Sequence, residues 1–209
     1  MRSTRRGLLH SRIVALRHVA FLGIVGATLA FGQAGAALSN ENDIDVKASK
    51  SGEVIVVDVD LVVHASQDEV WSVLTDYDHM AQFVANLEAS SIVSRTGNTL
   101  DVMQKGTARY GLLSFPFESV RQVVLTPIRE IHSTIISGDM TGSEITTRVA
   151  SDGAMTQVSV RSQFVPTRWI PPLIGPQAIA SETRKQWFTL REEILRRRAL
   201  VTEPTPAMR

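Results

Sequence analysis

The stretch QAIASETRKQWFTLREEILRRR, residues 177–198, contains the longest helical pattern in the chain. At 1.5 Å per residue such a helix would be about 33 Å long, enough to lie across a β-sheet. The three arginines at 196–198 suit the negative end of the helix dipole. The residues that recur at helical spacing and form its apolar stripe are Ile179, Thr183, Trp187, Leu190 and Ile194.

Upstream of this helix, short segments rich in β-branched residues alternate with turn residues. In segment 53–63, apolar residues alternate with Asp58 and Asp60, which is typical of a half-buried strand. Turns that contain glycine or proline separate three later pairs of such segments, which favours an antiparallel meander. The seven predicted strands are 53–63, 90–95, 99–110, 117–125, 130–137, 144–150 and 155–165.

Two short helices are predicted between the first and second strands. Ser66, followed three residues later by Glu69, forms a capping-box pattern, and a second short helix is predicted around 79–84. We therefore predict an α+β fold in which a curved seven-stranded antiparallel sheet wraps around the long helix. The apolar face of such a sheet must be covered. One helix cannot fill the space beneath a curved sheet, so we expect a cavity there.

The first 36 residues have the pattern of a signal peptide. Five arginines and no acidic residue precede an apolar stretch of 13 residues at 19–31 and a run of small residues, with cleavage expected after Ala36. This stretch is shorter than the roughly 20 residues of a spanning helix, although anchoring by an uncleaved leader is an alternative. The segment TRRGLL at 4–9 resembles a twin-arginine motif, so Sec and Tat export both stay open. We predict export to the periplasm.

The domain organisation follows from these patterns. Residues 1–36 are the predicted signal peptide, 37–52 a flexible N-terminal segment, 53–198 the ligand-binding domain and 199–209 a disordered tail. Without the five leader arginines, 17 Lys and Arg face 21 Asp and Glu, a net charge of −4. This charge gives no basic face for a nucleic acid.

Several chemistries are excluded or disfavoured by the sequence. The chain has no cysteine, which excludes disulfides, thiolate metal sites and thiol catalysis. His64, His79 and His132 show no ligand spacing, so no metal site is predicted. The chain also has no glycine-rich phosphate loop and no nucleophile elbow. We accordingly predict no catalytic residue and no cofactor.

Several short motifs resemble those of a known superfamily. They are EVWSVLTDY at 69–77, FV at 83–84, QKG at 104–106, GDM at 138–140 and PP at 171–172. In this order they resemble the START-like superfamily (SRPBCC; polyketide cyclase/dehydrase and lipid transport), in particular its ubiquinone-binding branch, over roughly residues 54–197. The resemblance implies a helix-grip fold and a hydrophobic ligand such as a lipid, quinone or polyketide. The proline usual after the Phe83 position in that branch is absent here, so the ligand's identity stays open.

Two polar residues fall in apolar strand registers. Gln104 alternates with Leu100 and Val102, so it is a candidate to contact a ligand oxygen, unless a bulge at Gly106 turns it outward. Arg121 lies in a similar register, and an inward orientation would require an anionic partner. For Arg121 we favour the alternative, a bulge or an edge position that leaves it solvated.

Aromatic residues complete the candidate ligand-binding set. Tyr110 and Phe115 flank a Gly-Leu-Leu loop expected at the mouth of the cavity, and Phe117 begins the register that contains Arg121. Trp187 lies on the helical stripe, where aromatic residues are more often core than ligand contacts. The candidate ligand-binding residues are Gln104, Tyr110, Phe115, Phe117, Arg121 and Trp187.

The sequence leaves three hypotheses for function. The first is a carrier for a hydrophobic small molecule or lipid, with transient membrane contact during ligand exchange. The second is a polyketide cyclase or aromatase, for which Arg121, Tyr110 or Asp139 would supply acid/base chemistry. The third is an envelope interaction protein with a filled interior. We favour the carrier, and the sequence does not determine the oligomeric state.

Overall fold

The computed structural model describes residues 41–110, 112–165 and 175–202, which lie in one compact unit, Leu38–Arg209. The predicted signal peptide 1–36, most of the proline-rich segment before the long helix and the last seven residues lie outside the described residues. The helices and strands of the described residues all belong to this unit.

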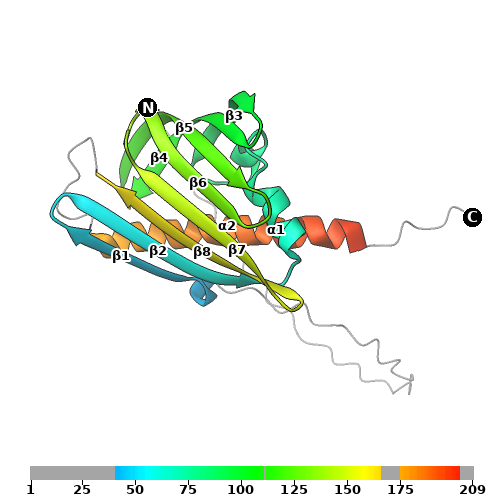
Figure 1. Cartoon of the computed structure of the whole chain (residues 1–209). Helices are drawn as coiled ribbons and strands as arrows, with labels where there is room; N and C mark the ends of the chain where they lie inside the picture. Colours follow the sequence, from blue (N-terminus) through cyan, green and yellow to red (C-terminus); the bar gives the residue numbers. More distant parts are fainter. Residues whose placement is uncertain (1–40, 111, 166–174, 203–209) are drawn as a thin grey trace, which may run out of the picture. The chain divides into compact units, whose positions relative to one another are not determined.

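The sheet contains eight antiparallel strands in the order β1-β2-β8-β7-β6-β5-β4-β3, and it curves around the long helix (Figure 1). This arrangement confirms the predicted α+β, helix-grip architecture. The strands are β1 (Asp45–Ser51), β2 (Val54–Val63), β3 (Leu87–Thr96), β4 (Thr99–Tyr110), β5 (Leu113–Thr126), β6 (Glu130–Gly138), β7 (Glu144–Asp152) and β8 (Met155–Phe164).

The prediction of seven strands was wrong by one, because β1 lies within the segment 37–52 that we expected to be flexible. Val46 is buried on its inner side, whereas Asp45 and Lys47 are exposed and form an ion pair of 2.6 Å. Charged residues of this kind discourage further pairing at a sheet edge. They also dilute the apolar alternation, which explains why the sequence pattern does not reveal this strand. The backbone carbonyl of Ile44 accepts a hydrogen bond from Arg184 Nε at 3.1 Å, which ties this edge to the long helix.

Two short helices lie between β2 and β3, as predicted. Helix α1 (Gln67–Leu74) begins at the Ser66–Glu69 capping box, in which both reciprocal hydrogen bonds form. The second is a short 3-10 helix, η2 (Met80–Gln82), and a further 3-10 turn, η1 (Glu41–Asp43), precedes β1.

The long helix, α2 (Pro176–Thr202), packs against β1, β2, β4 and α1. On its predicted apolar stripe, Ile179, Leu190 and Ile194 are buried in the core. The helix continues through residues 199–202, so that part of the predicted disordered tail was wrong. Ala199 and Leu200 are strong helix formers, and the helix has no local reason to end at the three arginines.

Two glycines of the sequence motifs are required by close backbone approaches. A Cβ at Gly106 would lie 2.0 Å from the carbonyl oxygen of Asn86, in the loop before β3. Gly138 has φ +86°, and a Cβ there would lie 2.2 Å from the carbonyl oxygen of Glu118. These glycines therefore fix how β4 meets the η2–β3 loop and how β6 leaves β5.

Candidate functional site

A cavity of about 280 Å³ lies beneath the sheet, with walls from its inner face, α2 and the α1–η2 region. This volume is just below the usual range for small-molecule sites, about 300 to 1,000 Å³. Most lining residues are apolar, and a few polar side chains interrupt them. The lining residues are Val57, Val59, Leu74, Tyr77, Met80, Val84, Asn86, Leu87, Gln104, Phe117, Arg121, Ile131, Ser133, Ile145, Thr147, Val160, Ser162, Thr183, Gln186, Trp187 and Leu190.

Gln104 points inward and is only 3% exposed. Its amide nitrogen donates to Ser90 Oγ at 3.2 Å and lies 3.5 Å from Met80 Sδ. The alternative in which a bulge at Gly106 turns Gln104 outward is wrong, because β4 and β5 stay in continuous register through Gly106. Gln104 thus occupies the cavity wall, as the alternation of its strand indicated.

Arg121 also lines the cavity, so the solvated position that we favoured was wrong. The irregularity occurs on the neighbouring strand: Val120 pairs with Ser137 and Arg121 with Ile135, which leaves Ile136 as the extra residue on β6. Strand β5 therefore keeps its alternation and directs Arg121 inward. Burial lowers the pKa of Arg121, an effect that the nearby Tyr77 opposes. Its Nε atom is buried and has no hydrogen-bond partner among the described residues.

Three further polar residues lie on the inner side near Arg121, and none of them was among the candidate ligand-binding residues. Burial raises the pKa of Tyr77 to about 12, although the charge of Arg121 and a hydrogen bond with Ser133 both act to lower it. Ser119, two residues before Arg121 on the same face of β5, is 2% exposed, and its hydroxyl lacks a partner within the described part of the chain. For Ser133 a usable signal existed, because it alternates with Ile131 and Ile135.

The candidate aromatic residues divide between cavity and core. Phe117 and Trp187 line the cavity. Phe115 is partly buried and packs against the core, and it is not a lining residue. Tyr110 ends β4, and its side chain lies outside what the structure describes. Ligand contacts by any of these residues remain a prediction.

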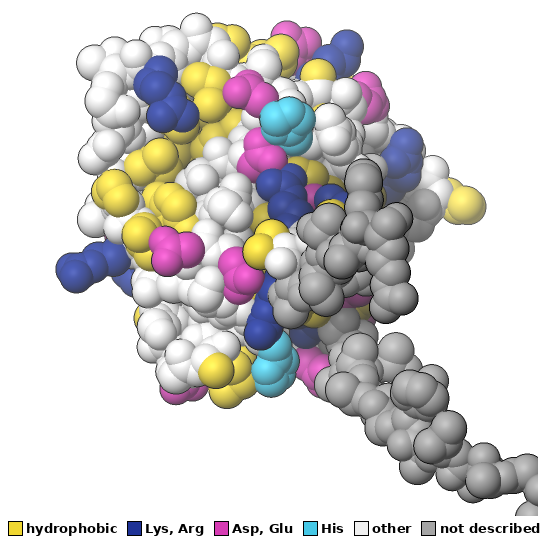
Figure 2. All heavy atoms as spheres, turned by 90° about the vertical axis from the view of Figure 1, so that its right-hand side faces the viewer, with side chains coloured by type: hydrophobic (Ala, Val, Ile, Leu, Met, Phe, Trp, Pro, Cys, Tyr) yellow, Lys and Arg dark blue, Asp and Glu magenta, His cyan; other side chains and the backbone are white. Residues whose placement is uncertain are grey.

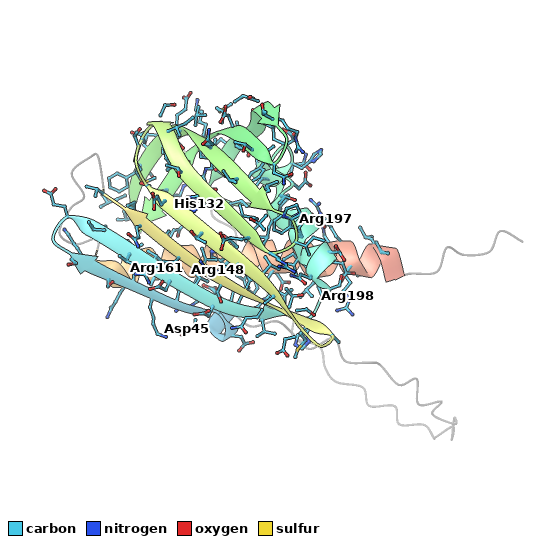
Figure 3. All side chains as sticks on the ribbon, viewed as in Figure 1. Asp45, His132, Arg148, Arg161, Arg197 and Arg198 are labelled. Carbon is cyan, nitrogen blue, oxygen red and sulfur yellow. The ribbon has the colours of Figure 1, made fainter. Side chains whose placement is uncertain are left out.

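A charged cluster beside the cavity holds α2 against the α1–η2 region. Arg197, labelled in Figure 3, donates from Nη2 to Asp76 Oδ2 at 2.8 Å and from Nε to Glu193 Oε1 at 2.6 Å. The guanidinium of Arg197 also lies 5.2 Å from the centre of the Phe83 ring. His79 contacts the second oxygen of Asp76 at 2.7 Å. Asp76 therefore anchors the end of α2 to the turn that follows α1.

The pKa values in this cluster reflect its hydrogen bonds. A hydrogen bond from Arg196, supported by Arg197 and opposed by burial, lowers the pKa of Glu193 to about 2. Burial acts to raise the pKa of Asp76, but hydrogen bonds from His79 and Arg197 outweigh it and the pKa is lowered. Acidic, basic and histidine side chains also lie close together on the face seen in Figure 2.

Asp139, the third candidate for acid/base chemistry, does not line the cavity. Its carboxylate accepts a hydrogen bond from the Glu118 backbone at 3.1 Å, and its own N–H donates to the Glu118 carbonyl at 2.9 Å. Among the residues that the structure describes, no three His, Asp or Glu side chains are placed to hold a metal ion. In the same residues, no helix has the length and apolar character needed to span a membrane.

Comparisons with known proteins agree with this architecture. The sequence profile of the family "Polyketide cyclase / dehydrase and lipid transport" matches residues 63–178. A search of curated protein sequences finds no match.

Solved structures with the same fold include human StAR-related lipid transfer protein 5, at 13% identity and a TM-score of 0.60, covering 74% of this chain and 83% of that one. A START superfamily protein from Mycobacterium smegmatis has 14% identity and a TM-score of 0.58, with 68% and 97% covered. An aromatase/cyclase from Streptomyces sp. R1128 has 17% identity and a TM-score of 0.57, with 69% and 95% covered. At these identities the structures show the fold alone. Since the profile matches more than half of the 209 residues, the chain belongs to the polyketide cyclase / dehydrase and lipid transport family.

Proposed function

We propose that this protein is an exported carrier that holds a hydrophobic small molecule between its sheet and helix α2. The observation that supports this function is the cavity of about 280 Å³, whose walls are largely aliphatic and aromatic. A few polar groups in an apolar pocket are the usual composition of a small-molecule site. The fold is also that of human StAR-related lipid transfer protein 5.

The lining residues favour binding over acid/base catalysis. Arg121 and Tyr77 are the ionisable side chains among the described lining residues. An arginine stays protonated in proteins, and a phenol with a pKa of about 12 is protonated at neutral pH. Neither can accept a proton from a substrate under those conditions, whereas a cyclase of the general-base type requires such an acceptor. We therefore propose the carrier in preference to the cyclase.

Export is part of the proposal and rests on the sequence of residues 1–36. Its test is cell fractionation of the host followed by N-terminal sequencing of the purified protein. We expect the protein in the periplasmic fraction with Ala37 as its first residue. Recovery in the cytoplasm with the leader intact would contradict this part of the proposal.

The carrier hypothesis is tested by identifying what the protein retains. The protein is purified from the envelope of its host without detergent, and its organic extract is analysed by mass spectrometry. Thr183 lines the cavity from α2, so Thr183→Phe should fill part of it and reduce the co-purified compound. A matched control is Val93→Phe, at an exposed position of β3. An extract without any enriched apolar compound would count against the carrier.

The β4–β5 hairpin is the segment that we propose for membrane contact during ligand exchange. It extends four residue pairs beyond the Gly106–Phe117 pair at the cavity. Near its tip Leu112 is fully exposed and Leu113 is 39% exposed. Apolar side chains at a loop tip suit the boundary between head groups and acyl chains.

Ligand transfer between vesicles tests this contact. We expect Leu112→Asp to slow transfer by about tenfold, while the equilibrium affinity for the ligand stays unchanged. Val93→Asp, at another exposed apolar position, should transfer at the wild-type rate. Equal rates for all three proteins would show that the hairpin does not contact the membrane.

A further inference from the structure

We propose that the ligand is an amphiphile with an anionic head group, and that Arg121 binds this head group inside the cavity. The inference rests on the proposed carrier function and narrows its ligand class. It begins from the charges that face the cavity. Arg121 supplies a positive charge, and the described lining residues include no aspartate or glutamate to balance it.

The surroundings of Arg121 leave its charge uncompensated. No described acidic side chain forms an ion pair with it, and its buried Nε has no hydrogen-bond partner among the described residues. Its electrostatic neighbour is the neutral phenol of Tyr77. An unpaired charge in an apolar site costs considerable free energy, and a bound anion would remove this cost.

Ser119 can supply a further hydrogen-bond donor beside Arg121, and Gln104 is a second polar neighbour. On the inner face of β5, Ser119 lies two residues before Arg121, and its hydroxyl also lacks a partner among the described residues. Gln104 pairs with Ser119 across the β4–β5 ladder, and Val102 pairs with Arg121. Gln104 is therefore a diagonal neighbour of Arg121 on the same face, and the Cα atoms of such neighbours are about 7 to 8 Å apart.

These donors select the chemistry of the head group. A guanidinium recognises carboxylates and phosphates through paired N–H donors. Away from Arg121, the lining is uncharged and mostly apolar, with Val57, Val160 and Leu190 among its side chains. The ligand that fits both regions has one oxyanion at one end and a hydrocarbon body. A carboxylate and a phosphate monoester share this chemistry.

The experiment compares three probes with the same hydrocarbon chain. Delipidated full-length protein is titrated calorimetrically with dodecanoate, dodecyl phosphate and methyl dodecanoate, below their aggregation concentrations. We expect at least one anion to bind about 10 to 100 times more tightly than the ester, since a hydrogen bond to a charged group contributes about that factor. The tighter of the two anions identifies the head group as carboxylate or phosphate.

Variants assign the preference to Arg121. In Arg121→Gln the anions should bind no more tightly than the ester, whereas Arg121→Lys should keep part of the preference. Arg95→Gln removes the same charge from an exposed position of β3 and should leave the preference intact. Circular dichroism confirms that each variant is folded.

The possible failures separate the two proposals. If wild-type protein binds the ester as tightly as both anions, the head-group inference is wrong while the carrier function stands. The same conclusion follows if Arg121→Gln keeps the full preference. If none of the three probes binds, both the head-group inference and the carrier function for this ligand size are overturned.

Discussion

Replacing Arg121 with methionine should make the ligand-free protein more stable. Met shares the unbranched stem of Arg but is shorter, and it is apolar, flexible and suited to irregular spaces. In the wild-type protein, the buried Nε has no hydrogen-bond partner among the described residues. Such an unsatisfied group costs about 1 to 3 kcal/mol, and replacing buried charges with apolar residues of similar size often stabilises proteins.

The expected gain is in the lower part of that range, because Arg121 is half-buried and borders a cavity that can hold water. We therefore expect the free energy of unfolding to rise by about 1 to 2 kcal/mol. For a chain of this size, this corresponds to a melting temperature higher by about 2 to 8 °C.

Urea unfolding of delipidated wild-type and Arg121→Met proteins, followed by circular dichroism, measures this difference. Arg95→Met, on the exposed side of β3, serves as the control and should change stability by less than about 0.5 kcal/mol. Loss of more than about 1 kcal/mol in a correctly folded Arg121→Met protein would refute the reasoning, since the guanidinium would then be stabilised within the ligand-free protein.

Three further predictions concern single residues. Gly106→Ala should lower the free energy of unfolding by about 2 to 4 kcal/mol, because its Cβ would meet the Asn86 carbonyl at 2.0 Å. Gly175→Ala, with open space around it, should leave the free energy of unfolding nearly unchanged in urea titration. Equal stability of the two variants would contradict the steric argument. Glu193 has a pKa of about 2, below its ordinary 4.5, so its contribution to stability is complete above pH 5 and lost as the pH falls toward 2. Glu193→Gln should therefore lose less stability than the wild-type protein between pH 5 and pH 2. Equal losses in the two proteins would exclude the effect. In Tyr110→Phe protein, the absorbance of the remaining tyrosine, Tyr77, should titrate near pH 12; a midpoint near 10 would show that the phenol is not buried.

The element pattern could be predicted well because local residues determine it. The Ser66–Glu69 box forms both of its hydrogen bonds, and the alternation of segment 53–63 corresponds to the buried inner side of β2. Strand β1 was missed because its exposed side chains are charged or small, which is useful at an edge but weakens the apolar alternation.

The candidate site could be predicted only in part. Alternation placed Gln104 and Phe117 on the inner face correctly, and the same rule applied to Arg121 gave the inward orientation. We favoured solvation for Arg121 because buried arginines are rare, and this general tendency was wrong at a cavity wall. Tyr77 gains its significance from Arg121 on β5 and Ser133 on β6, which its own segment does not reveal.

By itself the sequence determined the order of the helices and of seven strands, the inner side of β2 and of β4, and the apolar stripe of the last helix. These features depend on residues a few positions apart, whose spacing matches the periods of helix and strand. Only the tertiary structure decided that β1 joins the sheet, that Arg197 meets Asp76 more than 100 residues away, and that Arg121 faces a cavity without a described carboxylate. Contacts between distant segments depend on how the sheet curves around α2, and the local periods do not encode that curvature.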